Sequence, residues 1–241
     1  CEDGGLVASE TTTIADAEVT RVSRSTRLIH VEWLTEEDET VIISTTRPEL
    51  ICACGVVLVH PEDNRYTHLV GKRIHLPMPV DDRSEFVEIK AHPSVKMDFG
   101  SGVLMVCSYG DQNDVSVFRE LGLNPYPAID LDGNMTSVSG PLSGLSVIDA
   151  RNEAINILEQ DGRINSIDER DQEIPVSERG GNPIEIILLK EWYVKQVDIQ
   201  NRLEQLVNEV RFVPERNKQL LLDWMHSVSI DWPISRRRWY H

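Results

Sequence analysis

Short apolar and β-branched runs fill the first half of the chain and predict strands. "AEVTRVSR" and "RLIHVEWL" flank a short polar stretch, so they predict a β-hairpin. Further strands are predicted by "TVIISTTR", "CGVVLVH", "RIHLPMPV", "FVEIKAH" and "GVLMVCS". Many short strands at close spacing favour a β-barrel or sandwich over a doubly wound parallel sheet.

Helical periodicity enters later in the chain. "DVSVFREL" predicts a helix that stops near Gly122, and "LSVIDARNEAINILEQDG" predicts a second helix that ends at Gly162. In the second helix, Ile148, Ile155 and Leu158 fall near helical spacing. Two helices are therefore expected after the strand-rich first half.

The pattern changes again after residue 165. "IEIILLKEWYVKQ" predicts one long strand, whereas "DIQNRLEQLVNEV" and "PERNKQLLLDWMHSV" predict two helices. Pro214 suits the first turn of the second of these helices, where its missing N–H costs nothing. The pattern as a whole predicts a β-rich core followed by a helical tail.

Composition narrows the class of protein. The 241 residues carry 40 acidic and 24 basic side chains, and this net charge of −16 argues against a non-specific nucleic-acid binder. The arginines at 236–238 are the exception, and such a cluster is more typical of a solvated or partner-facing end. With no long apolar run, no signal peptide at the acidic N-terminus and no CxxC pair, we expect a cytoplasmic protein.

Common catalytic motifs are absent from the sequence. The seven histidines form no HxH or HExxH pair, and no GxSxG elbow or GxxxxGK[ST] loop occurs. Cys107 lies in a predicted strand with no histidine nearby in sequence, which favours a small buried side chain over a nucleophile. We therefore expect neither a zinc hydrolase nor covalent catalysis by serine or cysteine.

The stretch "GSGVLMVCSYGDQND" carries the first candidate chemistry. Asp111 and Asp114 lie where a predicted strand ends and a helix begins. Carboxylates in that place either cap the helix or form a pocket that binds a cationic ligand. The pattern alone favours capping, and both interpretations stay open for each residue.

The stretch "STTRPELICACG" carries a second group of candidate functional residues. Arg47 follows Thr45 and Thr46 and precedes a proline, which keeps the arginine backbone extended. A guanidinium presented in this way suits a phosphate or a carboxylate ligand. The alternative is an ion pair with Glu49 or another acid of the protein itself.

Four motifs together resemble one enzyme family: "STTRPEL", "VHPEDNRYTHLVGKRI", "DFGSGVLMVCSYGDQND" and "DWPISRRRWY". Over about residues 14–240 the chain is similar to the inserted editing domain of the valyl-tRNA synthetases. Its sequence resembles the archaeal branch of that family. Each motif recurs in the isoleucyl and leucyl enzymes, but "TTRPEL" combined with "GDQND" favours the valyl ones. The HIGH and KMSKS signatures of the adenylate-forming site are absent. The resemblance therefore implies a fragment without the ATP-dependent site and without a cofactor.

The resemblance implies an α+β fold: a β-barrel-like editing core with a few packed helices, a β-ribbon stem and a helical C-terminal tail. It places a stem strand region at 1–27, the editing domain at 28–165, the return strand of the stem at 166–196, and a helical segment leading to the catalytic core at 197–241.

The implied function is hydrolysis of mischarged Thr-tRNA(Val), a deacylase activity that protects translational fidelity. Its partners would be the 3′ end of tRNA(Val) and the catalytic core of the same polypeptide, with no membrane involved. Two alternatives remain: editing for an isoleucyl or leucyl enzyme, and a module that binds the tRNA acceptor end without hydrolysis.

The family's editing residues match positions of this chain one at a time. Asp114 matches the acid that anchors the α-amino group of the misattached amino acid. Asp111 matches the acid near the threonine hydroxyl. Thr45, Thr46 and Arg47 match the strip that lines the pocket and the 3′ end of the tRNA. The resemblance thus implies catalytic roles for the two aspartates and binding roles for the strip.

Some positions depart from the family pattern. Leu50, Met105 and Cys107 stand in the binding pocket where threonine, lysine and threonine are common in bacterial enzymes. Relatives often carry CxxC pairs where this chain reads "ASETTT" and "SERGGN", so we predict no structural zinc. We also expect backbone amides of "GSG" and "CSYGD" to hold the terminal adenosine, the ester carbonyl or the attacking water.

Overall fold

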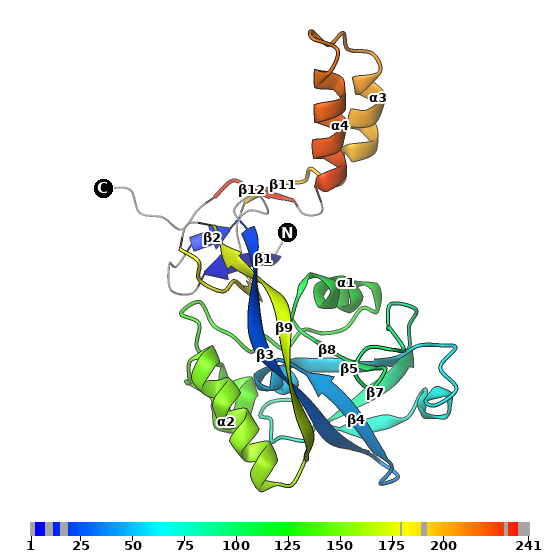
Figure 1. The fold of residues 1–241 in the computed structure, drawn as a ribbon, viewed down its shortest axis with the longest axis vertical. Coiled ribbons are helices and arrows are strands. Elements are labelled where there is room, and N and C mark those ends of the chain that lie inside the picture. The colour runs from blue at the N-terminus through cyan, green and yellow to red at the C-terminus, as the bar shows by residue number, and fades with distance from the viewer. Residues whose placement is uncertain are drawn as a thin grey trace.

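The structure, a computed structural model, describes residues 3–7, 12–14, 19–178, 180–188, 192–228 and 231–235. Its largest element is a seven-stranded sheet in the order β4-β3-β6-β7-β5-β8, with β9 also paired to β3 (Figure 1). All pairs are antiparallel except β5 with β7. The strands are β3 (Val19–Thr35), β4 (Thr40–Thr45), β5 (Cys54–Val59), β6 (Arg73–His75), β7 (Phe86–Ala91), β8 (Val103–Cys107) and β9 (Ile164–Ser177).

The sheet curls into a half-barrel around the main core. β4 and β8 lie close together although they stand at opposite ends of the sheet order. Side chains alternate between the two faces of each strand, so Val31, Trp33 and Ile43 all point inward and are buried. The curled β-core with several helices confirms the predicted α+β fold class.

Helices pack beside the half-barrel. α1 (Gln112–Glu120) contacts β8, while α2 (Val147–Gln160) contacts two 3₁₀ segments, η3 (Pro48–Ala53) and η5 (Ser137–Leu142). A third 3₁₀ turn, η4, spans Thr67–Leu69. Both predicted helices of this region are confirmed. In α2, Ile155 and Leu158 are buried, but Ile148 is 69% exposed and does not share their face.

β3 is one continuous strand, so the predicted hairpin is wrong. Residues 19–31 of β3 pair with β9 as a long antiparallel ribbon that rises from the half-barrel (Figure 1). Ser25 and Thr26 suggested a turn from their polarity, yet both pair with residues of β9. Most side chains of the ribbon are exposed, so polar residues do not interrupt it as they would a buried strand.

The other described strands form two small sheets. β1 (Asp3–Val7) pairs with β2 (Thr12–Ile14) and with β10 (Glu185–Leu188), and β11 (Tyr193–Val194) pairs with β12 (Trp232–Pro233). The stretch "IEIILLKEWYVKQ" is therefore not one long strand, because β10 and β11 belong to different sheets.

The C-terminal helices form as predicted. α3 (Gln200–Val207) and α4 (Asn217–Ser227) contact each other and project away from the half-barrel (Figure 1). Pro214 precedes the first residue of α4 by three positions, so its predicted place in the first turn is wrong. The arginines at 236–238 lie outside the described residues. In the described parts of the chain, no helix combines the length and the apolar character needed to cross a bilayer.

Candidate functional site

The paired aspartates follow the turn that links β8 to α1. At the end of β8, Ser108 donates from both its N–H and its Oγ to the carbonyl of Ala53, at 2.9 and 3.3 Å. Tyr109 then adopts a left-handed backbone with φ of 57°, which redirects the chain toward α1. The buried strand thus holds one end of the turn, and the helix fixes the other.

The two aspartates make different hydrogen bonds in this turn. Asp111 caps α1, because its Oδ1 accepts a 2.8 Å hydrogen bond from the N–H of Asp114. The capping interpretation is therefore correct for Asp111. Asp114 is the third residue of the helix, and its Oδ2 accepts a 3.1 Å bond from the N–H of Cys107. Within the described chain, nothing donates to Oδ2 of Asp111 or to Oδ1 of Asp114.

Asp114 is the electrostatically unusual group of the site. Burial raises its pKa to about 8, and the neighbouring charge of Asp111 adds to the rise. The Cys107 amide and the Arg47 guanidinium act in the opposite direction but do not outweigh burial. At neutral pH the Asp114 carboxyl group is therefore mostly protonated. A cationic ligand would favour the ionised form and release that proton.

Gly110 makes room for this carboxyl group. A Cβ at that position would collide with Oδ2 of Asp114 and would also crowd the Cβ of Cys107. The glycine therefore lets the backbone pass directly beside the acid. Its carbonyl also accepts a hydrogen bond of 3.4 Å from Nη1 of Arg47, which links the turn to the second candidate stretch.

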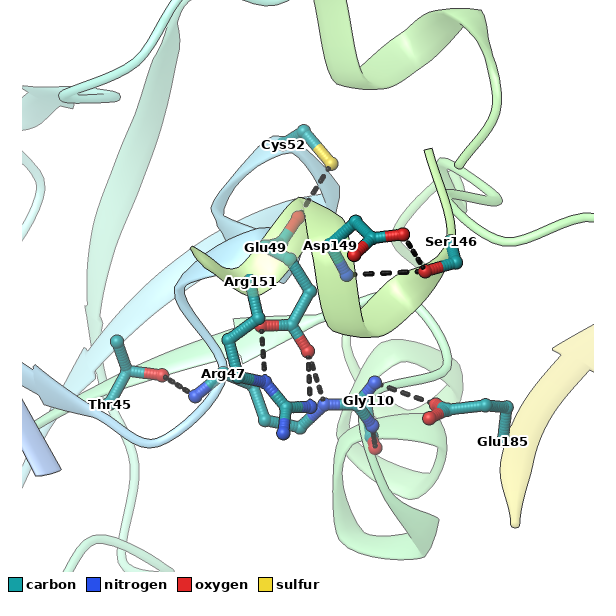
Figure 2. Close-up of polar contacts among 9 residues, drawn as sticks. All are labelled: Thr45, Arg47, Glu49, Cys52, Gly110, Ser146, Asp149, Arg151 and Glu185. Carbon is teal, nitrogen blue, oxygen red and sulfur yellow. Dashed lines mark hydrogen bonds and ion pairs between the residues drawn. The ribbon is translucent and has the colours of Figure 1, made fainter. Parts of the chain in front are cut away.

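Arg47 lies in a network of four charged side chains (Figure 2). Its Nε donates to Glu49 at 3.0 Å and its Nη2 to Glu185 at 2.6 Å. Arg151 of α2 binds the same Glu49 carboxylate through Nε at 3.0 Å and Nη2 at 2.7 Å. The ion pair with Glu49 that the sequence left open is therefore present.

The pKa values of this network follow from its pairing. Burial acts to lower the pKa of Arg47, but Glu185 and Glu49 outweigh it and hold that pKa above its ordinary value. Burial acts to raise the pKa of Glu49, but Arg47 and Arg151 outweigh it and keep the pKa low. Arg47 and Glu49 are thus both charged at neutral pH, although the Glu49 side chain has no exposed surface.

The other pocket positions inferred from the resemblance are largely buried. Thr45 accepts a 3.0 Å hydrogen bond from the Arg47 N–H, and Thr46 beside it is half-buried. Leu50, Met105 and Cys107 are buried in the main core. For Cys107, burial and nearby Cys54 raise the thiol pKa well above its ordinary value, in keeping with an unreactive apolar side chain.

The "GSG" turn lies at the opposite end of β8 from the aspartates. A Cβ at Gly100 would meet the side chain of Ser44 of β4 at 2.8 Å, so the Gly100 backbone lies directly against that side chain. Beside it, Phe99 is 48% exposed, and the Arg170 guanidinium lies 4.8 Å from its ring centre. Five strand residues span about 17 Å. Only a ligand of that length would contact both "GSG" and Asp114.

A pocket of about 440 Å³ adjoins the aspartate turn on the far side of α1. Its lining is largely apolar and contains neither aspartate. The lining residues are Ser108, Tyr109, Val115, Phe118, Arg119, Gly122, Leu123 and Pro125. The two carboxylates are therefore not part of the lining of this cavity.

The fold also brings a serine, a histidine and an aspartate into line on the outer face of the sheet. His30 Nδ1 lies 2.8 Å from Ser44 Oγ, and its Nε2 lies 3.0 Å from Asp168 Oδ2. Gly100 covers the serine, and Asp168 is 66% exposed. The closely packed backbone leaves little room for a substrate at Ser44, so these contacts form a cross-strand network rather than a nucleophilic site.

The described residues also bear on metal binding. Nowhere among them do three or more histidine, cysteine, aspartate or glutamate side chains gather in a way that could hold a metal ion. The expectations of no structural zinc and no cofactor stay predictions.

Comparison with known sequences identifies the family. The pattern of the family described as "tRNA synthetases class I (I, L, M and V)" matches residues 7–241. This chain belongs to the class I tRNA synthetases. The match covers nearly the whole chain, including both candidate stretches.

Within the class I tRNA synthetases, the chain is similar to archaeal valine–tRNA ligases. It is 40% identical to that of Nanoarchaeum equitans over 230 residues, which cover 95% of the chain and 30% of the relative. It is 39% identical to that of Aeropyrum pernix, covering 95% and 28%, and 36% identical to that of Methanocaldococcus jannaschii, covering 94% and 26%. The chain thus spans about 30% or less of the length of these curated relatives.

Sequence reasoning missed two members of the site of this class I synthetase chain. Glu185 and Arg151 lie 138 and 102 residues from their partners Arg47 and Glu49, and neither belongs to a quoted motif that carries chemistry. No local pattern reports such distant pairing. The one available signal was the "PELICACG" run, in which a single acid lies among residues that are otherwise apolar.

Proposed function

We propose that this chain is the editing domain of a valyl-tRNA synthetase and hydrolyses the ester bond of Thr-tRNA(Val). The single observation that carries the proposal is the partly buried Asp114 carboxyl group, held beside Asp111 in a turn of a chain similar to valine–tRNA ligases. The proposed parts are a stem at 1–27 and 166–196, an editing unit at 28–165, and a helical segment at 197–241.

The two carboxylates suit the two polar groups that a threonyl ester presents. Asp114 would bind the α-ammonium group, because a charge-assisted hydrogen bond inside a partly buried site is worth about 1.5–3 kcal/mol. Asp111 would accept from the threonine hydroxyl through its Oδ2 while its Oδ1 keeps the helix cap. A site built to bind a hydroxyl rejects valine, since its own polar groups would be left unpaired.

The remaining groups would position the rest of the substrate. An aminoacyl ester is already activated, so a water molecule held against its carbonyl can attack without a covalent intermediate. The high pKa of the buried Cys107 thiol argues against its use as a nucleophile. The ring of Phe99 is partly exposed and has the Arg170 guanidinium over it, so its other face is where the terminal base could stack.

Selective deacylation tests this proposal. The chain is incubated with Thr-tRNA(Val) and, separately, with Val-tRNA(Val), beside its Asp114→Ala variant. We expect loss of threonine but not valine, and at least a hundredfold slower loss with Asp114→Ala. Equal loss of both amino acids would contradict discrimination by the aspartates. Preference for a mischarged tRNA(Ile) or tRNA(Leu) would reassign the chain to a sister enzyme, and tRNA binding without deacylation would leave a binding module.

The proposed partners are the 3′ end of tRNA(Val) and the remainder of a longer synthetase chain. The extent of the similarity supports the second, since relatives are more than three times as long as the matched region. The net charge of −16 predicts weak affinity of this part alone for tRNA, and this affinity should fall steeply with salt.

A further inference from the structure

Each nitrogen of the Arg47 guanidinium already donates to an acceptor of the protein. Its Nε faces Glu49, its Nη2 faces Glu185, and its Nη1 faces the carbonyl of Gly110. The four-member network of Arg47, Arg151, Glu49 and Glu185 carries two positive and two negative charges, so it is neutral as it stands. A phosphate group that binds the Nε and Nη2 side of this guanidinium would therefore have to replace one carboxylate.

The two carboxylates differ in how firmly they are held. Glu49 has no exposed surface and accepts from both Arg47 and Arg151, through both of its oxygens. Removing its charge would leave two cations facing each other in a buried site. Glu185 accepts only from Arg47 among the described residues, through Oε2, and keeps 12% of its side chain exposed. Glu185 is thus the carboxylate that can be exchanged.

Glu185 also comes from a separate part of the fold. It lies in β10, which pairs with β1 in the small β10-β1-β2 sheet, whereas Arg47 and Glu49 belong to the wall of the half-barrel. Figure 2 shows Glu185 reaching Arg47 from outside the cluster formed by Glu49 and Arg151. The 2.6 Å ion pair is therefore a link between this sheet and the candidate site.

We propose that the Glu185 carboxylate occupies the anion-binding edge of Arg47 and is displaced by a phosphate group of the tRNA 3′ end. This rests on the proposed editing function, which supplies the phosphate-bearing ligand. The planar fork of a guanidinium binds phosphate as well as it binds carboxylate. Displacement would also break the ion pair between β10 and Arg47, while Ile187 keeps β10 packed in the main core. Glu185 is a positioning residue in this account and does not touch the ester.

The test is the affinity of the full chain for a minihelix RNA that carries an acceptor stem and a 3′-CCA end. Glu185→Gln keeps the shape of the side chain and removes its charge. We expect it to tighten the Kd on the order of tenfold at low salt, about the value of one charge-assisted hydrogen bond. In deacylation of Thr-tRNA(Val), KM should fall by a similar factor while kcat changes little. Glu185→Asp retains the charge and should stay within about twofold of the wild type.

Two further variants distinguish exchange at Arg47 from a general loss of negative charge. Glu173→Gln removes an exposed carboxylate of β9 and should leave the Kd within about twofold. In an Arg47→Gln background, Glu185→Gln should give no gain, because the exchanged site is missing. An unchanged or weaker Kd in folded Glu185→Gln, an equal gain in Glu173→Gln, or a gain that persists without Arg47 would overturn the proposal.

The failure of this proposal can be told from failure of the proposed function. Deacylation by the wild type with no affinity gain in Glu185→Gln overturns the exchange alone. Tighter RNA binding by Glu185→Gln without deacylation by either protein supports the exchange and overturns the hydrolytic function.

Discussion

The half-barrel and the 192–235 segment use their apolar residues in opposite ways. In the half-barrel, large side chains such as Trp33, Ile43 and Leu58 are fully enclosed. Among the described residues of the segment, Trp192, Val213 and Leu220 are 78, 77 and 65% exposed. The half-barrel therefore completes a core of its own, whereas the described part of the segment leaves large apolar side chains exposed.

Their charged residues differ in the same way. Glu49 is fully buried and is paired with two arginines that come from different parts of the half-barrel. In the segment, both side chains of the Lys195–Asp198 ion pair are exposed. Buried pairs depend on every partner, whereas exposed pairs are screened by water and contribute little. The polar network of the half-barrel is therefore needed for the stability of that region, whereas the exposed ion pairs of the segment contribute little to stability.

The largest expected effect is on the free energy of unfolding, and one tryptophan substitution in each region measures it. Trp33→Ala should cost about 4 kcal/mol of unfolding free energy, because it leaves a large cavity in a closed core. Trp192→Ala should cost less than about 0.5 kcal/mol. Urea unfolding followed by circular dichroism measures both. Similar losses for the two tryptophans would show that the segment is packed against the half-barrel more closely than their exposures indicate.

The next effect concerns the buried charges. Glu49→Gln should cost about 3 kcal/mol of unfolding free energy, because two arginines lose their shared counter-charge in a buried site. Glu204→Gln in α3 is the matched control and should change stability by less than about 0.5 kcal/mol. Urea unfolding at neutral pH compares them. A stable Glu49→Gln variant would mean that water reaches the network and replaces the missing charge.

A smaller effect is the pH dependence of stability that the raised pKa of Asp114 causes. Its pKa is raised to about 8 from the ordinary value of 3.8, so its contribution to stability is complete below about pH 4 and is lost as the pH rises through 8. Asp114→Asn, which stays neutral, should be more stable than the wild type on the order of 2 kcal/mol at pH 9. Near pH 4 the two proteins should differ by less than about 0.5 kcal/mol.

Thermal unfolding across this pH range measures the difference. Asp198→Asn in the 192–235 segment is the control: Asp198 is 67% exposed, so its effect should not vary with pH in this window. A gap between Asp114→Asn and the wild type that is the same at pH 4 and pH 9 would contradict a raised pKa.

The sequence predicts the half-barrel better than the ribbon, for a physical reason. β4, β5 and β8 are short apolar runs because at least one face of each is buried, and hydrophobic patterning reports burial. The first ten residues of β9, "INSIDERDQE", are almost all exposed, so they carry no such pattern. In β3, which pairs with this part of β9, the polar residues Ser25 and Thr26 were for the same reason mistaken for a turn.

The candidate site was predictable only in part. The place of Asp111 and Asp114 between a strand and a helix follows from local sequence, as does the buried character of Cys107. The division of labour between the aspartates depends on which carboxylate reaches the Cys107 amide, which only the folded turn decides. The pairing of Arg47 with Glu185 joins residues 138 positions apart, beyond any local pattern.

Proton release on ligand binding tests the central claim most directly, namely that Asp114 receives the ammonium group of a threonyl ester. The ligand is a non-hydrolysable amide analogue of 3′-threonyl-adenosine, and calorimetry at pH 7 in buffers of different ionisation enthalpy counts the protons. We predict that the wild type releases close to one more proton than Asp114→Asn, because binding ionises a group whose pKa is about 8 in the empty site. Asp114→Asn should also bind at least tenfold more weakly. Equal proton release and equal affinity in the two proteins would contradict the account.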